Sequence, residues 1–131
     1  MNAAPDITAV HALAVAVGAA VGALLRWLAG LAFNGLWAGF PLGTLLVNCL
    51  GGGLIGVAMV WFARAPDETQ RLLLVTGVLG GFTTFSSFSA ESLGLMQRGA
   101  FGLALLHSAA HLAGALACTA LGFTLARMVL R

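Results

Sequence analysis

Charged side chains are scarce in this chain of 131 residues. Only 8% of the residues are charged, against roughly 25% in an ordinary soluble domain, while 60% are hydrophobic and the mean hydropathy is +1.02. This composition excludes a soluble globular domain and indicates a membrane protein. Lysine is absent, and the net charge of +2 suits anionic lipid head groups at helix ends better than a nucleic-acid partner.

Patterns typical of soluble chemistry are also missing. Cys49 and Cys118 lie in apolar stretches without paired spacing, so neither a disulfide nor a cysteine metal site is indicated. No nucleophile–base–acid arrangement or phosphate-binding glycine loop is evident, and the sequence therefore does not favour an enzyme. Because no positive charge precedes the first apolar stretch, we expect a retained helix there instead of a cleaved signal peptide.

Four apolar segments are long enough to cross a hydrocarbon core, for which a helix needs roughly 20 residues. They run from about residues 7 to 30, 41 to 62, 72 to 96 and 101 to 125. The connections between them are short. We therefore expect an all-α membrane protein with a single four-helix transmembrane domain over residues 1–131.

Small residues recur at one-turn spacing in three of these segments, which lets helix backbones approach closely. The pairs are Gly18 with Gly22, Gly52 with Gly56, and Ala110 with Gly114. For any single pair, the alternative is that the small residues face lipid, where glycine is merely tolerated, and have no role in packing. Together, the three pairs predict tight helix packing.

The polar connection "ARAPDETQR" predicts the start of the third helix, with Asp67 as N-cap and Gln70 at the third helical position. Arginines near the expected helix ends give a hint of topology. Arg98 and, arguably, Arg26 lie opposite the N-terminus, whereas four arginines lie on its side: Arg64, Arg71, Arg127 and Arg131. This bias favours a cytoplasmic N-terminus by a margin of two.

The stretch "GGFTTFSSF", residues 80–88, brings two glycines and four hydroxyl side chains into an apolar segment. Inside a bilayer every backbone polar group must be satisfied within the protein, so a helix that breaks here must line a cavity or a partner. A break frees carbonyls that can bind a small cation and N–H groups that favour anions. The alternative is a continuous helix whose Ser and Thr hydroxyls bond to the preceding turn.

Phe85 and Phe88 are three residues apart and share a helix face that runs close to Thr84 and Ser92. The positive edges of two aromatic rings can line a path for a small anion without trapping it. Packing against lipid or a neighbouring helix is the common alternative for such a pair.

Thr44 and Asn48 lie one turn apart in the otherwise apolar second segment. Asn48 can join helices by hydrogen bonds, or it can donate to an anion that loses its water. Two ionisable residues lie within the expected spans, and such residues are functional candidates by default. Arg26 can snorkel to the interface, whereas Glu91 can pair with an arginine, bond as the neutral acid or face a watery vestibule.

His107 and His111 lie one turn apart on one face of the fourth segment, a spacing able to hold a metal or a haem. No Cys, Asp or Glu accompanies them in that segment. Satisfied polar residues that face a cavity are the alternative interpretation.

Three segments together resemble one family. "GALLRW" (22–27), "GTLLVNCLGGGLIG" (43–56) and above all "GGFTTFSSFSAE" (80–91) are similar to the signature segments of the Fluc/CrcB fluoride channels. Order, length and helix count agree, so the resemblance covers essentially the whole chain. It implies passive export of cytoplasmic fluoride, and hence fluoride resistance, by a protein of a bacterial-type inner membrane.

The resemblance also implies an antiparallel, dual-topology homodimer whose third helix is broken mid-membrane, with two pores and a structural Na⁺ at the centre. Gly80 and Thr83 would present backbone carbonyls to the Na⁺. By position, the expected fluoride-pore residues are Arg26, Asn48, Thr84, Phe85, Phe88, Glu91 and Ser92, with Thr44, His107 and His111 as further possible pore lining.

The fourth segment departs from the family pattern, because His107 and His111 stand where the family often has Tyr and Ser. Neutral imidazoles can donate hydrogen bonds, whereas protonated ones add positive charge, which makes a pH dependence conceivable. Two other functions compete. A proton-coupled small multidrug exporter depends on an acid deep in its first helix, which this chain lacks, and a haem- or metal-binding membrane subunit would use the two histidines.

Overall fold

A computed structural model describes residues 8–130 of the chain. Two residues used above, Ile7 at the start of the first expected span and Arg131 in the arginine count, lie outside the described part. Four helical elements within it are long and apolar enough to cross a membrane. The first, second and fourth are α1 (Ala9–Phe33), α2 (Leu42–Arg64) and α6 (Phe101–Val129).

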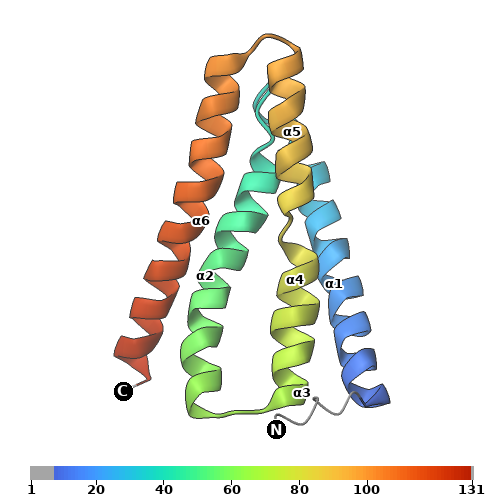
Figure 1. The fold of residues 1–131 in the computed structure, drawn as a ribbon, viewed down its shortest axis with the longest axis vertical. Coiled ribbons are helices and arrows are strands. Elements are labelled where there is room, and N and C mark those ends of the chain that lie inside the picture. The colour runs from blue at the N-terminus through green and yellow to red at the C-terminus, as the bar shows by residue number, and fades with distance from the viewer. Residues whose placement is uncertain (1–7, 131) are drawn as a thin grey trace, which may run out of the picture.

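The third element, Glu68–Gln97, is composite. It consists of α3 (Glu68–Arg71), a π-helical stretch η1 (Leu72–Leu79), α4 (Gly80–Phe82) and α5 (Phe85–Gln97). The ribbon is interrupted between α4 and α5, near the middle of the molecule (Figure 1). The wider π-helical stretch has no counterpart in the sequence predictions.

The helices extend beyond the expected spans at their C-terminal ends, and the third element also begins earlier, at Glu68. Asp67 caps the third element as predicted, because its side chain accepts a hydrogen bond from the Gln70 N–H at 2.8 Å, so this prediction is confirmed. Glu68 and Arg71 then form an exposed ion pair at 2.8 Å. The expected spans covered only the apolar windows, whereas helices also need polar end residues to satisfy their terminal backbone groups.

Close backbone packing joins α1 to the third element. A Cβ added at Gly18 would collide with the carbonyl oxygen of Leu73, and one at Gly22 with that of Val78. Only glycine allows this approach. The predicted role of this glycine pair is thereby confirmed.

The helices α2 and α6 approach each other in the same way. A Cβ at Gly56 would collide with the carbonyl oxygen of Thr119. On α6, however, the residue pressed against a neighbouring backbone is Gly122, whereas an added Cβ at Gly114 meets only the Cys49 side chain, at 3.0 Å. Beside Gly114, a Cβ at Gly52 would lie 2.8 Å from the Ala115 carbonyl oxygen, so α2 and α6 pack tightly here as well, and most tightly about two turns further along.

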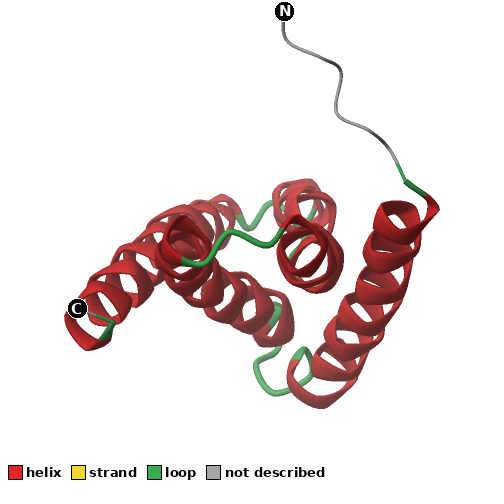
Figure 2. Ribbon diagram, turned by 90° about the horizontal axis from the view of Figure 1, so that it is seen from below, coloured by secondary structure: helices red, strands yellow, loops and turns green. Residues whose placement is uncertain are grey.

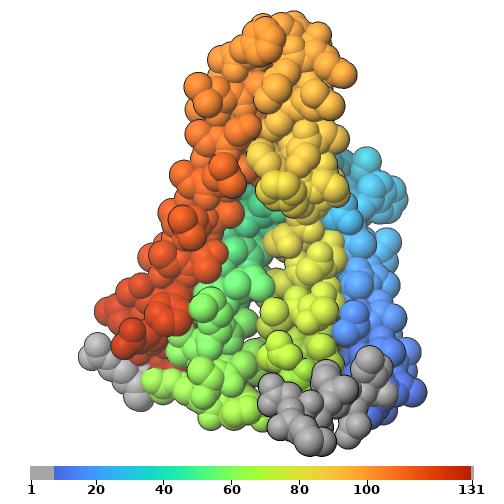
Figure 3. Space-filling model, viewed as in Figure 1, coloured from blue at the N-terminus to red at the C-terminus, as the bar shows by residue number. Residues whose placement is uncertain are grey.

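The helices form an open arrangement. Seen along the long axis, α1 lies at one edge and α6 at the other, and the four elements do not close into a ring (Figure 2). In the space-filling view the molecule is narrow at the α5–α6 turn and broad at the opposite end (Figure 3). The four elements of a single chain therefore do not enclose a closed central space.

Candidate functional site

The Asn48 side chain replaces helical backbone hydrogen bonds at the interruption of the third element. Thr83 and Thr84 have extended backbones, with φ and ψ of −83° and 158°, and −152° and 121°. The Thr84 N–H, which would donate to the Gly80 carbonyl in a continuous helix, donates instead to Asn48 Oδ1 at 2.8 Å. Asn48 Nδ2 in turn donates to the Thr84 carbonyl at 2.9 Å. This two-point bond explains why an amide stands in an apolar helix.

Arg26 satisfies a second group that the interruption frees. In a continuous helix the Gly81 carbonyl would accept from the Phe85 N–H. Here it accepts from Arg26 Nε at 3.0 Å. Arg26 therefore bonds to the third element within the protein, which the snorkelling alternative did not include.

The first turn of α5 is closed by the Thr84 hydroxyl, which accepts from the Ser87 N–H at 3.1 Å. Two carbonyls are left over. Among the described residues, no donor reaches the carbonyl of Gly80 or that of Thr83. Those are the two oxygens that the family resemblance assigned to Na⁺.

A polar cluster lies beyond the interruption, between α2, α5 and α6. The Thr44 hydroxyl donates to Glu91 Oε1 at 2.5 Å. Ser92 Oγ lies 2.9 Å from Nδ1 of His107, a side chain that is fully buried. His107 Nε2 is 3.3 Å from Glu91 Oε2, but neither atom has an aligned hydrogen bond to any described residue. The fold thus brings an acid to the histidines from another helix.

His111 is tied to Asn48 by a contact of 3.0 Å between Asn48 Nδ2 and His111 Nδ1. The orientation of the amide follows from the network, because Asn48 Oδ1 accepts from a backbone N–H that can only donate. Nδ2 therefore donates, Nδ1 accepts, and the proton of a neutral His111 is on Nε2. That Nε2 is buried and has no partner among the described residues.

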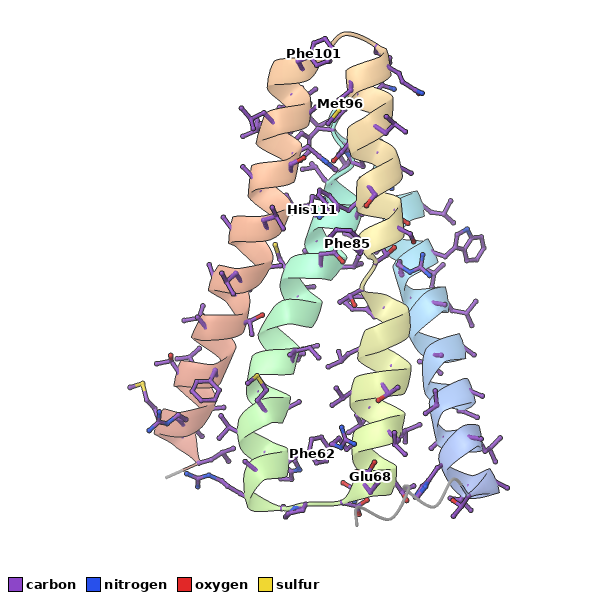
Figure 4. The ribbon with its side chains drawn as sticks, viewed as in Figure 1. Phe62, Glu68, Phe85, Met96, Phe101 and His111 are labelled. Atoms are coloured by element: carbon purple, nitrogen blue, oxygen red, sulfur yellow. The ribbon has the colours of Figure 1, made fainter. Side chains whose placement is uncertain are left out.

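The two phenylalanines have different surroundings. Phe88 is buried and its ring centroid lies 4.7 Å from that of His111. Phe85 packs edge-on against Phe88 at 5.2 Å but is 72% exposed. In the stick view Phe85 and His111 lie at neighbouring heights, on the third and fourth elements (Figure 4). Only one of the two rings is enclosed by a single chain.

Two open grooves flank the interruption. One, of about 330 Å³, is lined by Asn48, Thr83, Thr84, Phe85, Phe88 and His111, among others. The other, of about 370 Å³, is lined by Arg26, Thr44, Thr84, Ser87 and Glu91, among others. Thr84 lines both, whereas Ser92, His107 and Gly80 line neither. The residues that line the two grooves therefore form a band around Thr84 in the middle of the molecule, next to the buried Ser92 and His107.

Sequence reasoning missed some members of this band. Asn34 lines the second groove, and its Oδ1 accepts from the Thr44 N–H at 3.2 Å. Ser108 lies 3.3 Å from Ser92, between their hydroxyl oxygens. Asn34 lies after the first apolar segment, where a polar residue attracts no notice, so no sequence signal singled it out.

Comparison with known proteins identifies the family. A family described as "CrcB-like protein, Camphor Resistance (CrcB)" matches residues 13–123. The "Fluoride-specific ion channel FluC" of Bordetella petrii is 55% identical over 112 residues, which cover 84% of this chain and 86% of the relative. The protein of the same name from Pseudomonas aeruginosa is 52% identical over 112 residues, with 84% and 88% covered.

A third relative extends the match. The "Fluoride-specific ion channel FluC" of Bordetella bronchiseptica is 50% identical over 121 residues, or 91% of this chain and 93% of the relative. Family match, identity and coverage all agree with the four apolar helices. The chain therefore belongs to the CrcB-like protein family and is a multi-pass protein of the bacterial plasma membrane.

Proposed function

We propose that this chain forms a fluoride-selective channel through which cytoplasmic fluoride leaves the cell passively. Relatives with about half of their residues identical carry the name of such a channel. The observation that carries the proposal is the band of uncharged donors and ring edges around Asn48, Thr84 and Phe88. A channel of this kind makes and breaks no covalent bonds and is not an enzyme.

Fluoride is small and strongly hydrated, so its path needs donors in series that replace water without holding the ion too tightly. The Ser87 hydroxyl and the edges of Phe85 and Phe88 supply such groups, whereas the Thr84 hydroxyl already donates to Ser87 Oγ at 3.1 Å. Asn48 has a different role in this arrangement, because both protons of its amide already have acceptors. The unpartnered Nε2–H of His111 takes the role of the free donor.

The path needs a second copy of the chain. Four helices in an open arrangement leave Phe85 exposed and both grooves unclosed. An antiparallel homodimer would cover this side and give two pores. Reporter fusions after the last helix test this: they should signal from both sides of the membrane, whereas a single orientation would contradict the antiparallel dimer.

A structural Na⁺ fits the carbonyls of Gly80 and Thr83. Carbonyls of an unwound transmembrane backbone can coordinate Na⁺, and these two have no donor among the described residues. Bound there, Na⁺ would supply positive charge to dipoles that otherwise remain unsatisfied. The nearest positive side chain named above, Arg26, bonds to the neighbouring Gly81 carbonyl.

Fluoride efflux from liposomes that contain the purified protein tests the proposed function. We expect an electrode to record fast fluoride release when a potassium ionophore balances the charge, and little release of chloride under the same gradient. Empty liposomes and liposomes with the Asn48→Ala variant are the controls. Release of fluoride no faster than from empty liposomes would overturn the proposal.

A further inference from the structure

We propose that Glu91, His107 and His111 form a binding site for a divalent transition metal of the Zn²⁺ class. His107 and His111 are one turn apart on α6, and Glu91 comes from α5. One possible ligand atom from each residue lies within 4.8 Å of the other two. Two histidines and one carboxylate are a common zinc ligand set.

Each of the three residues has one buried atom without a partner in the described part of the chain, residues 8–130. These atoms are Nε2 of His107, Nε2 of His111 and Oε2 of Glu91. The two imidazoles are 0% and 4% exposed, so water does not satisfy them from outside. Because buried polar atoms in proteins are almost always paired, a group with no partner needs an explanation, and an unseen ion is one of the standard ones.

The other polar atom of each residue is held in place. Ser92 contacts His107 Nδ1, Asn48 contacts His111 Nδ1, and the Thr44 hydroxyl donates to Glu91 Oε1. Metal-binding histidines almost always donate from their second nitrogen to an acceptor, which orients the ring. The Ser92 hydroxyl can accept from His107 Nδ1, and the Thr44 hydroxyl holds Glu91. Asn48, in contrast, presents a donor to His111 Nδ1, so this contact has to be given up when a metal binds.

The spacing and the donor atoms select the class of metal. Bonds of about 2.0–2.1 Å to a tetrahedral ion put the ligand atoms roughly 3.4 Å apart. Glu91 Oε2 and His107 Nε2 are already 3.3 Å apart, so His111 has the larger adjustment to make. Imidazole nitrogen suits Zn²⁺, Cu²⁺ and Ni²⁺, whereas Ca²⁺ and Mg²⁺ prefer oxygen alone. A fourth position stays open.

Metal binding has a consequence for Asn48. Coordination through His111 Nε2 moves the imidazole proton to Nδ1, which then no longer accepts from Asn48 Nδ2. Asn48 keeps both bonds to Thr84 and loses this one. These residues belong to the fluoride path proposed above, so the metal would block fluoride efflux. This consequence rests on the proposed function alone.

Binding is tested separately from efflux. The purified channel in detergent, stripped with a chelator, is titrated with ZnCl₂ by calorimetry, and we expect one Zn²⁺ per chain. Glu91→Gln, His107→Asn and His111→Gln should each weaken binding at least tenfold. The matched control is His11→Gln, which changes the only other histidine and should leave binding unchanged.

X-ray absorption at the zinc edge of the unaltered protein requires no variant to fold. It should report two imidazole ligands and one carboxylate. No calorimetric Zn²⁺ binding, fewer than two imidazoles, or three variants that bind like the unaltered protein would each overturn the metal site, and the proposed channel function would be unaffected. Zn²⁺ binding with two imidazoles supports the site. If fluoride efflux then continues at its full rate, the site still stands and its position in the path is wrong.

Discussion

The two halves of the third element contrast in how they contact their neighbours. The first half, η1 and α4, approaches α1 backbone to backbone, with a Cβ at Gly77 only 2.8 Å from Gly18 Cα. The second half, α5, presents hydroxyl, carboxyl and aromatic side chains to α2 and α6. The third element therefore changes from backbone contacts to side-chain contacts at Thr83 and Thr84.

The contrast has an energetic meaning. In the first half stability depends on the glycines that face α1, Gly77 and Gly81, where an added carbon would force the helices apart. In the second half it depends on polar groups that pair within a low-dielectric interior. Substitutions in the first half should therefore damage the fold, and those in the second half should damage the site while the fold survives.

The largest effect is expected from Gly22→Val. The new Cβ would collide with the Val78 carbonyl oxygen and lie 2.7 Å from the Phe82 nitrogen. Overpacking of this kind costs roughly 3 kcal/mol of folding free energy. Size exclusion should show aggregated protein and thermal unfolding should occur at a lower temperature. Gly102→Ala is the control, because nothing lies within 4 Å of its added Cβ. A Gly22→Val protein as stable as that control would contradict the view that the first half depends on close backbone contacts.

Asn48→Ala should act on the second half. It removes the two bonds to Thr84 and the one to His111. Each lost bond that leaves a buried partner unpaired costs about 1–3 kcal/mol, so we expect fluoride efflux to fall about tenfold to hundredfold. Size exclusion should still give a single folded species. Efflux at the unaltered rate would show that the interruption does not need this amide.

The ring edges are tested by Phe88→Leu and Phe85→Leu, which roughly keep apolar volume and remove the aromatic quadrupole. The buried Phe88, which contacts His111, should matter more than the exposed Phe85 in a single chain. We expect Phe88→Leu to lower efflux about tenfold. If both leucine variants conduct normally and elute normally, these rings only pack and the anion path lies elsewhere.

Two substitutions at the interruption of the third element test the proposed Na⁺ site, which would depend on backbone carbonyls and not on side chains. Gly80→Val should reduce the dependence of dimer stability on Na⁺, because its helical backbone (φ −63°, ψ −37°) accepts valine while the added methyl groups would crowd a cation at the neighbouring carbonyl. Thr83→Ser should be mild, since it keeps the hydroxyl that bonds to Leu79 at 2.9 Å. Dimer dissociation measured across a series of Na⁺ concentrations distinguishes the two. Equal behaviour of both variants would contradict the backbone site.

The sequence predicted the helices better than the contacts between them. Apolar length and the Asp67 cap are local signals, and both hold in the structure. The approach of Glu91 to His107 and His111, and the bond from Arg26 to Gly81, join residues far apart in the chain. Helical spacing shows which residues share a face, but it cannot show which neighbour that face meets. The dimer, the Na⁺ and the dual topology stay predictions.

The smallest effect is expected from Arg26→Lys, which changes the bond between α1 and the end of the first half. Arg26 Nε donates to the Gly81 carbonyl through a planar guanidinium of fixed direction, whereas a lysine ammonium on a flexible stem can reach the same oxygen with less order. We expect about 1 kcal/mol of lost stability and a fivefold or smaller change in efflux. Arg26→Gln keeps a donor without charge and separates the two properties. If Gln matches Lys, the hydrogen bond matters at this carbonyl; if only Lys conducts normally, the positive charge matters, and Arg26 acts on the anion as well as on the helix.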